Sequence, residues 1–180
     1  AYVPKKFDTS DFKVENADVT LGSVKVTLPT LPEDYDAEYA AEGLTNVSVE
    51  NGILKYNATG VKPGQYTLNV KDKSSTYAPF SASFTLTTDN VVAVYNNNAK
   101  APALVAAKDV QADDFANFVK NIQKVSVNGK EYEASGKRAI KLINEDGTLV
   151  TTADALKAEG TYNIVVTATG YNTVSYTHLR

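Results

Sequence analysis

Short runs in which apolar and polar residues alternate recur along most of the chain. Residues 24–28, 65–71 and 80–86 carry apolar side chains at every second position, which is the pattern of a β-strand with one buried face. Gly, Pro and Asn residues separate the runs at intervals of roughly 8–12 residues, a spacing typical of β-sandwiches. The pattern therefore predicts a mainly β chain.

Two Asn-Gly pairs, Asn51-Gly52 and Asn128-Gly129, each lie between two alternating runs. Asn and Gly tolerate the positive φ angles of a two-residue type I′ turn, so each pair predicts a β-hairpin. In both halves a Gly-x-Tyr strand follows, at 64–66 and 160–162. This shared pattern has two explanations, an ancient duplication or two sandwiches that use similar hairpins, and we favour the second.

One helix is predicted, because Phe115, Phe118, Val119 and Ile122 form a single apolar stripe at helical spacing. Asp113 is placed to cap its N-terminus. Further strands are expected at 139–143, 148–150 and 161–169.

Residues 89–102 are polar, rich in turn formers and without periodicity, and we interpret them as a linker or long connection. The fold class predicted is mainly β with two domains. The first is an immunoglobulin-like β-sandwich in residues 1–90. The second, in residues 91–180, is a small β domain with one short α-helix near its start.

The composition removes most reactive chemistry. The 180 residues include no Cys, no Met, no Trp and a single His, His178. Disulfides, Cys-based metal sites and most histidine chemistry are thereby excluded, and we expect neither a metal nor a cofactor. The net charge of −3 gives no electrostatic reason to expect nucleic acid, and no apolar run is long enough to span a membrane.

Acidic pairs at 33–34, 36/38 and 145–146 are the nearest approach to a catalytic constellation. A glycosidase needs two carboxyl groups across a cleft, one of them with a raised pKa. All three pairs lie in turn-like segments beside Pro or Gly, where solvated acids are common. We therefore expect that the chain is not an enzyme.

Tyrosine is abundant, with eleven residues, and exposed tyrosines are typical of binding surfaces. Tyr77, Tyr95 and Tyr171 lie near turns and are the candidate contact residues. Tyr35 and Tyr39 have the Tyr-x-x-x-Tyr spacing of a surface haem-binding family, but they follow an acidic loop, so we expect no haem ligation there. A Lys–Asn cross-link involving Lys25, Lys71 or Lys141 stays open.

The second half resembles a known family. The residues that carry the resemblance are the helix 114–122, the hairpin 125–132 with its sequence VSVNGKEY, and the segment 160–172 that ends in ATGYN. Together, over about residues 112–176, they are similar to the Shr-like haemoglobin-interacting domain of Gram-positive surface proteins.

The resemblance implies an extracellular module of a bacterial cell-surface or cell-wall protein, joined to neighbouring domains of a longer parent chain. It implies a host or surface protein as the partner, with haemoglobin the specific hypothesis. Two alternatives stay open: a structural spacer or stalk, and a carbohydrate-binding accessory module. Residues 174–180 match the translated end of a sequencing-library transposon as well as an ordinary strand, so we assign His178 no function.

Overall fold

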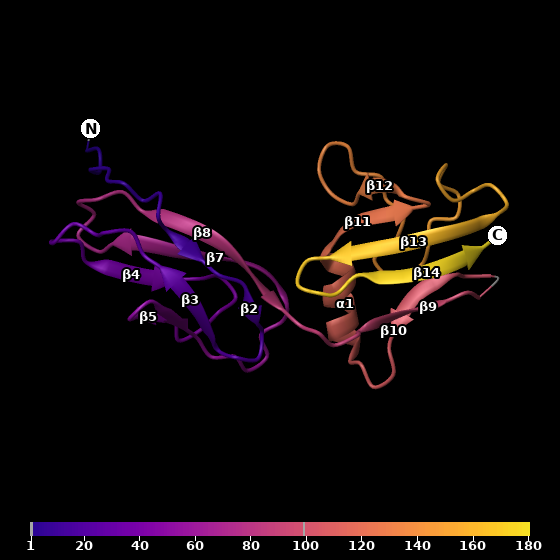
Figure 1. The fold of residues 1–180 in the computed structure, drawn as a ribbon, viewed down its shortest axis with the longest axis horizontal. Coiled ribbons are helices and arrows are strands. Elements are labelled where there is room, and N and C mark those ends of the chain that lie inside the picture. The colour runs from indigo at the N-terminus through magenta and orange to yellow at the C-terminus, as the bar shows by residue number, and fades with distance from the viewer. Residues whose placement is uncertain (1, 99) are drawn as a thin grey trace. The chain divides into compact units, whose positions relative to one another are not determined.

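β-Strands dominate the computed structural model, which describes residues 2–98 and 100–180 (Figure 1). The chain divides into two units, Ala1–Thr87 (unit 1) and Thr88–Arg180 (unit 2). Over the described residues, one short helix accompanies the strands, and the predicted mainly β fold class with its short helix is confirmed.

Unit 1 is a sandwich of two sheets, each four-stranded over the described residues. One sheet has the order β1 (Lys13–Val14), β3 (Ser23–Thr27), β6 (Ile53–Lys55) and β5 (Ser48–Glu50). The other has the order β2 (Ala17–Asp18), β8 (Phe80–Thr87), β7 (Gly64–Asp72) and β4 (Ala37–Ala40). Leu54 from the first sheet and Leu68 and Leu86 from the second are fully buried in the core of unit 1, as the alternating pattern of these strands requires.

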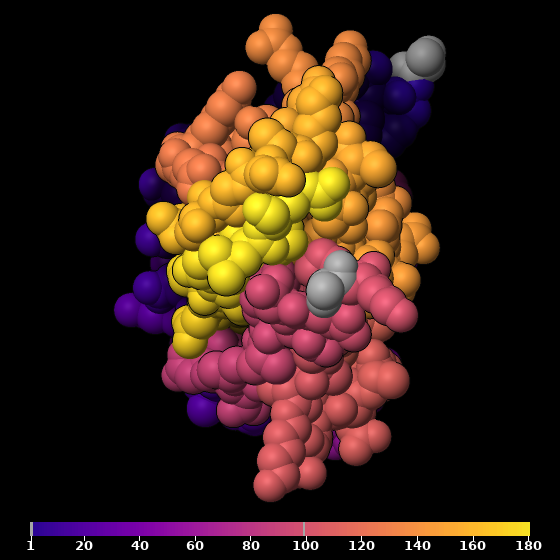
Figure 2. Space-filling view, turned by 90° about the vertical axis from the view of Figure 1, so that its right-hand side faces the viewer, coloured from indigo at the N-terminus to yellow at the C-terminus, as the bar shows by residue number. Residues whose placement is uncertain are grey.

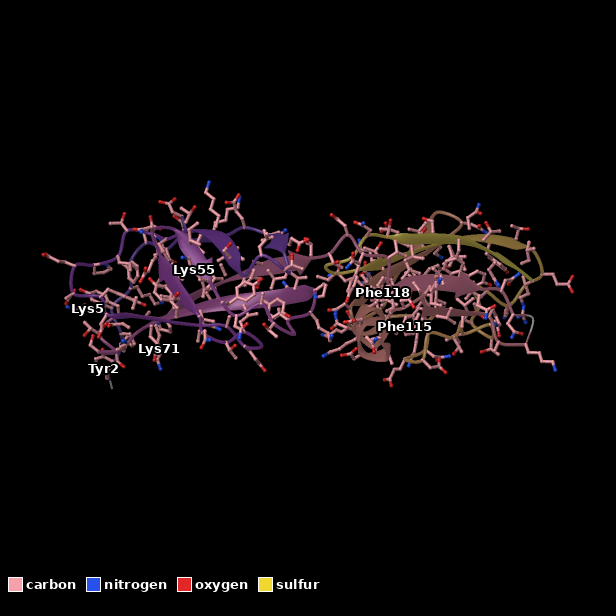
Figure 3. All side chains as sticks on the ribbon, turned by 90° about the horizontal axis from the view of Figure 1, so that it is seen from below. Tyr2, Lys5, Lys55, Lys71, Phe115 and Phe118 are labelled. Carbon is pink, nitrogen blue, oxygen red and sulfur yellow. The ribbon has the colours of Figure 1, made fainter. Side chains whose placement is uncertain are left out.

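Unit 2 begins with a hairpin of β9 (Ala93–Asn96) and β10 (Ala103–Ala106), followed by the helix α1 (Ala112–Lys120). A second sheet then has the order β12 (Lys130–Glu133), β11 (Ile122–Val127), β13 (Thr161–Ala168) and β14 (Val174–Leu179). Phe118, on the buried face of α1 (Figure 3), belongs to the same core as Ile164 and Val166 of β13. The short helix is therefore held by packing against the sheet rather than by its own propensity.

Both Asn-Gly hairpins are confirmed. Glu50 pairs with Ile53 across the first turn, and Val127 pairs with Lys130 across the second. The Asn and Gly residues of both turns have positive φ angles, as a type I′ turn demands. The strand predicted at 161–169 is also present, as β13.

Three local predictions were wrong. Residues 89–102 are not a linker, because 93–96 pair with 103–106 as β9 and β10. Each of these residues pairs with a partner 7 to 13 positions away in the chain, and such pairing leaves no periodic pattern in the sequence. Asp113 does not cap α1; the N-cap is Gln111, which makes no side-chain capping hydrogen bond. The strands expected at 139–143 and 148–150 reduce to two isolated bridges, one between Ile143 and Leu149 and one between Thr148 and Ala103.

Candidate functional site

Tyr77 lies in an aromatic cluster of unit 1. Its ring centroid is 5.9 Å from those of Phe7 and Tyr35, and the Lys5 ammonium lies 5.9 Å from its centre. The Tyr77 Oη donates a hydrogen bond of 2.7 Å to Asp34, and this bond raises the pKa of the Tyr77 phenol. The half-buried side chain is thus held on several sides by its own unit.

The loop that carries Tyr77 is organised by Asp72, which is 3% exposed. One carboxylate oxygen accepts hydrogen bonds from the amides of Asp36 (3.1 Å) and Ser74 (3.2 Å) and from the Ser74 hydroxyl (2.8 Å). The other accepts from the amides of Thr76 (3.0 Å) and Tyr77 (3.1 Å). Burial alone would raise the Asp72 pKa, but these hydrogen bonds outweigh it and lower the pKa to about 2. Asp72 therefore serves the fold of the loop.

Tyr95 lies on β9 in unit 2. Its ring stacks on that of Tyr176 at a centroid distance of 4.1 Å, and its Oη is hydrogen-bonded to Asn97 (2.7 Å) and to the Nδ1 of His178 (2.6 Å). His178 itself is 3% exposed, and burial lowers its pKa. Figure 2 shows the yellow C-terminal residues lying against the pink segment that contains β9 and β10.

Tyr171 follows β13 and packs on the helix. Its ring meets that of Phe118 edge to face at 5.2 Å, and its Oη accepts a hydrogen bond of 2.7 Å from the Asn117 amide. Tyr95 and Tyr171 both line a pocket of about 290 Å³, and the exposed Val91 and Val94 belong to the same lining. The structure thus brings two of the three predicted contact residues to one pocket, while Tyr77 belongs to the other unit.

A second surface feature of unit 2 was not predicted from the sequence. A groove of about 700 Å³, which we call the α1 groove, lies between α1, β11 and the segment 134–145. Its lining includes Ala116, Val119, Ile122 and Leu142, with Lys120 and Lys141 among its charged residues. The available signal was the basic run from Lys137 to Lys141, beside the exposed Ile140.

The acidic pairs behave as turn and surface residues. Asp34 accepts the hydrogen bond from Tyr77, and Glu38 pairs with Lys71 at 3.2 Å. Asp146 accepts hydrogen bonds from the amide (3.0 Å) and hydroxyl (2.6 Å) of Thr148 within its own turn. Across residues 2–98 and 100–180, no group of three or more His, Asp or Glu side chains is arranged to hold a metal ion.

Two of the three lysines considered for cross-links are exposed and ion-paired. Lys25 and Lys71 have side chains 74% and 65% exposed, and they form ion pairs with Glu15 and Glu38. The oxygens of Asp72, meanwhile, are occupied by backbone amides and a serine hydroxyl. Neither lysine is therefore placed for a Lys–Asn bond beside Asp72.

The donor groups of the two unit 2 pockets do not suit haem. Haem iron takes His, Cys, Met or Tyr as its axial ligand, and the lining of the α1 groove contains none of these residue types. In the smaller pocket the Tyr95 Oη is hydrogen-bonded to His178 and the Tyr171 Oη to Asn117. The Tyr176 Oη is buried. The residues of these two pockets therefore do not fit haem as a bound group.

Comparison with known families identifies unit 2. Residues 93–179 match the family model described as heme-binding protein Shr-like, Hb-interacting domain. The resemblance predicted for residues 112–176 is thereby confirmed, and the match extends it to the β9–β10 hairpin. The C-terminal half of the chain is thus similar to this haemoglobin-interacting family over residues 93–179. No curated protein matches the chain in sequence.

Several solved structures share a distant likeness in fold. The glucan-binding protein SGBP-B of Bacteroides ovatus, solved with a mixed-linkage heptasaccharide, is 13% identical with a TM-score of 0.28; the match covers 98% of this chain and 46% of that one. Murine CEACAM1b is 14% identical with a TM-score of 0.36, covering 93% and 98%. The human desmocollin-1 ectodomain is 8% identical with a TM-score of 0.26, covering 92% and 34%. Likenesses of this size indicate no function for this chain.

Proposed function

We propose that the chain is a non-catalytic extracellular module of a bacterial surface protein, and that unit 2 binds haemoglobin or another haem protein. The observation that carries the proposal is the family match over residues 93–179, which lies within the unit Thr88–Arg180. The helix of unit 2 is nine residues long, and none of the described helices is long and apolar enough to cross a membrane.

The surface of unit 2 supports a protein partner. Protein interfaces place apolar and aromatic anchors at their centre and polar groups around them. Unit 2 offers partly exposed Tyr95 and Tyr171 at one pocket, with exposed Val91 and Val94 in the same lining. The ligand that suits these surfaces is a whole haem protein rather than free haem, because the Tyr95 and Tyr171 phenol oxygens are hydrogen-bonded within the domain and the Tyr176 oxygen is buried.

A spacer role is the second candidate, and the structure of unit 1 favours it for that unit. The aromatic rings of unit 1 contact one another: Phe7 meets Tyr35, Tyr77 and Phe80 edge to face. A carbohydrate-binding module would instead need coplanar rings along a groove. Unit 1 would then serve to hold unit 2 away from the cell wall.

The test is a binding measurement with the whole chain. Immobilised chain is exposed in parallel to haemoglobin, apo-globin, free haem and cell-wall glycans, and binding is followed by biolayer interferometry. The proposal expects saturable binding of haemoglobin and none of the glycans. Binding of free haem alone, or of glycans alone, would contradict it, and binding of none of the four would favour the spacer.

A further inference from the structure

The α1 groove combines an apolar floor with an accessible apolar rim. Val119 of the helix and Ile122 and Val125 of β11 form part of its lining. At its edge, Ile140 is 48% exposed although its amide is fixed by a 3.0 Å hydrogen bond to the Glu133 carbonyl. An anchored, exposed isoleucine beside an apolar groove offers contact area that water solvates poorly.

The charges around this groove are mostly positive. Lys120 and Lys141 line it, and Lys137 and Arg138 are exposed on the adjoining segment. Glu145 also lines the groove, and Asp146 follows it in the sequence; hydrogen bonds from Thr148 lower the pKa of Asp146, with a smaller contribution from the charge of Lys141. Two cations and one acid thus line the groove, and two further cations lie on the adjoining segment.

Most of these cations have no partner within the domain. Within the part of the chain that the structure describes, Lys120, Lys137 and Arg138 form no salt bridge. Lysines elsewhere on the surface do pair: Lys71 with Glu38 at 3.2 Å and Lys157 with Asp154 at 2.9 Å. Unpaired cations concentrated at one groove leave a positive potential that an acidic ligand would complement.

We propose that the α1 groove docks an acidic segment of a partner protein, which places an apolar side chain on the groove floor and carboxylates beside Lys120, Lys137 and Arg138. Hydrophobic burial supplies affinity, and the charges supply orientation and rate of association. The inference rests on the proposed function in so far as it assumes a protein ligand, but it assigns the contact to a groove that shares no lining residue with the pocket of Tyr95 and Tyr171.

A peptide pair tests the chemistry directly. One synthetic peptide carries a Leu-Phe pair flanked on both sides by glutamates, and its matched partner carries lysines in place of the glutamates. Fluorescence anisotropy with the whole chain is expected to show at least about tenfold tighter binding of the acidic peptide, weakening as salt is raised. Equal binding of both peptides, or tighter binding of the basic one, would overturn the proposal.

Variants then locate the binding. Ala116→Trp places a bulky side chain into the groove from an exposed helix position, and Lys137→Glu with Lys141→Glu reverses two charges at its rim. Each is expected to weaken binding of the acidic peptide by about threefold to tenfold or more. The matched control, Lys13→Glu with Lys55→Glu, reverses two exposed lysines of unit 1, of which Lys55 is labelled in Figure 3, and is expected to leave the affinity unchanged.

Two further outcomes separate this inference from the proposed function. If the groove variants bind both haemoglobin and the acidic peptide as well as the wild type does, the α1 groove is not the docking site. The proposed function would still stand in that case. Self-association of the chain that Ala116→Trp abolishes, seen by analytical ultracentrifugation, would make a second copy the occupant and overturn the proposal. Circular dichroism melting curves confirm that each variant is folded.

Discussion

The hydroxyl groups of Tyr66 and Tyr162 make the same hydrogen bond in the two units. Each donates to the backbone carbonyl four residues earlier, Tyr66 to Lys62 at 2.5 Å and Tyr162 to Ala158 at 2.6 Å. A glycine lies two residues before each tyrosine, with φ angles of 150° and 148°. This arrangement resembles the tyrosine corner of immunoglobulin-like sandwiches, and it ties the segment that precedes β7 or β13 to the first residues of that strand.

Replacing either tyrosine with phenylalanine removes this bond while keeping the ring. We expect Tyr66→Phe and Tyr162→Phe each to lower the free energy of unfolding of their own unit by about 0.5–1.5 kcal/mol, which corresponds to a melting temperature lower by several degrees. Tyr39→Phe is the control, since the hydroxyl of Tyr39 makes no hydrogen bond among the described residues. Urea unfolding followed by far-UV circular dichroism measures the change, and equal losses in all three variants would contradict it.

The local turn chemistry could be predicted from the sequence, whereas the sheet order could not. Both Asn-Gly hairpins form as expected, yet they occupy different places. The β5–β6 hairpin lies in the sheet that does not contain β7, while β11 and β12 share a sheet with β13. Type I′ turns depend on two residues, but sheet membership depends on long-range packing that no local pattern specifies. The different placement favours similar hairpins over duplication as the origin of the shared pattern.

Asp72 is expected to make unit 1 sensitive to acid. Its pKa is about 2 in the folded chain and about 3.9 when unfolded. Because the folded state binds the proton less readily, the ionised carboxylate stabilises the fold fully above about pH 4, and this contribution is lost as the pH falls toward 2. Asp72→Asn should lower stability at pH 7 and flatten the dependence between pH 4 and 2.

The measurement is a series of urea titrations of wild type and variant across this pH range. Glu50→Gln, which removes an exposed charge at the first hairpin, serves as the control and should retain the wild-type slope. The prediction is contradicted if the stability of the wild type does not fall between pH 4 and 2, or if Asp72→Asn keeps the wild-type slope. Either result would show that the hydrogen bonds around Asp72 do not lower its pKa in the folded chain.

Truncating a core side chain should destabilise only the unit to which that side chain belongs. Phe118 is 1% exposed in unit 2, and Leu68 is fully buried in unit 1. Phe118→Ala is expected to cost about 3–5 kcal/mol and Leu68→Ala about 2–5 kcal/mol. Hydrogen exchange read by mass spectrometry should show faster exchange in residues 88–180 for the first variant and in residues 1–87 for the second. Faster exchange across the whole chain in either variant would mean that the units unfold together.

The candidate binding residues show where sequence reasoning stops. The sequence indicates that Tyr77, Tyr95 and Tyr171 lie near turns, but it does not indicate their hydrogen-bond partners. The Tyr77–Asp34 and Tyr171–Asn117 hydrogen bonds join residues 43 and 54 positions apart. The role of these tyrosines as contact residues stays a prediction. The α1 groove could not be predicted from the sequence for the same reason, because a helix, a strand and a loop that only the fold brings together form it.

Gly147 and Gly129 both have positive φ angles, but only Gly147 lies too close to its neighbours to accept a Cβ atom. Its φ is +92°, and a Cβ at this position would lie 2.3 Å from the Leu104 carbonyl oxygen and 2.9 Å from the Phe115 ring. Gly129 has a similar φ of +86°, but a Cβ there would meet nothing within 4 Å. Gly129→Ala should therefore cost only the backbone strain of about 1–2 kcal/mol.

Gly147→Ala carries the same strain and must also displace the β10 backbone or the helix residue Phe115, so it should cost at least about 1–3 kcal/mol more. The two variants are compared by urea unfolding of the whole chain, with near-UV circular dichroism reporting the packing of the tyrosine and phenylalanine rings. Equal losses of stability would mean that the turn at Asn144–Gly147 can move away from β10 without cost. In that case the contact between Gly147 and Leu104 would not fix the position of the β9–β10 hairpin against the rest of unit 2.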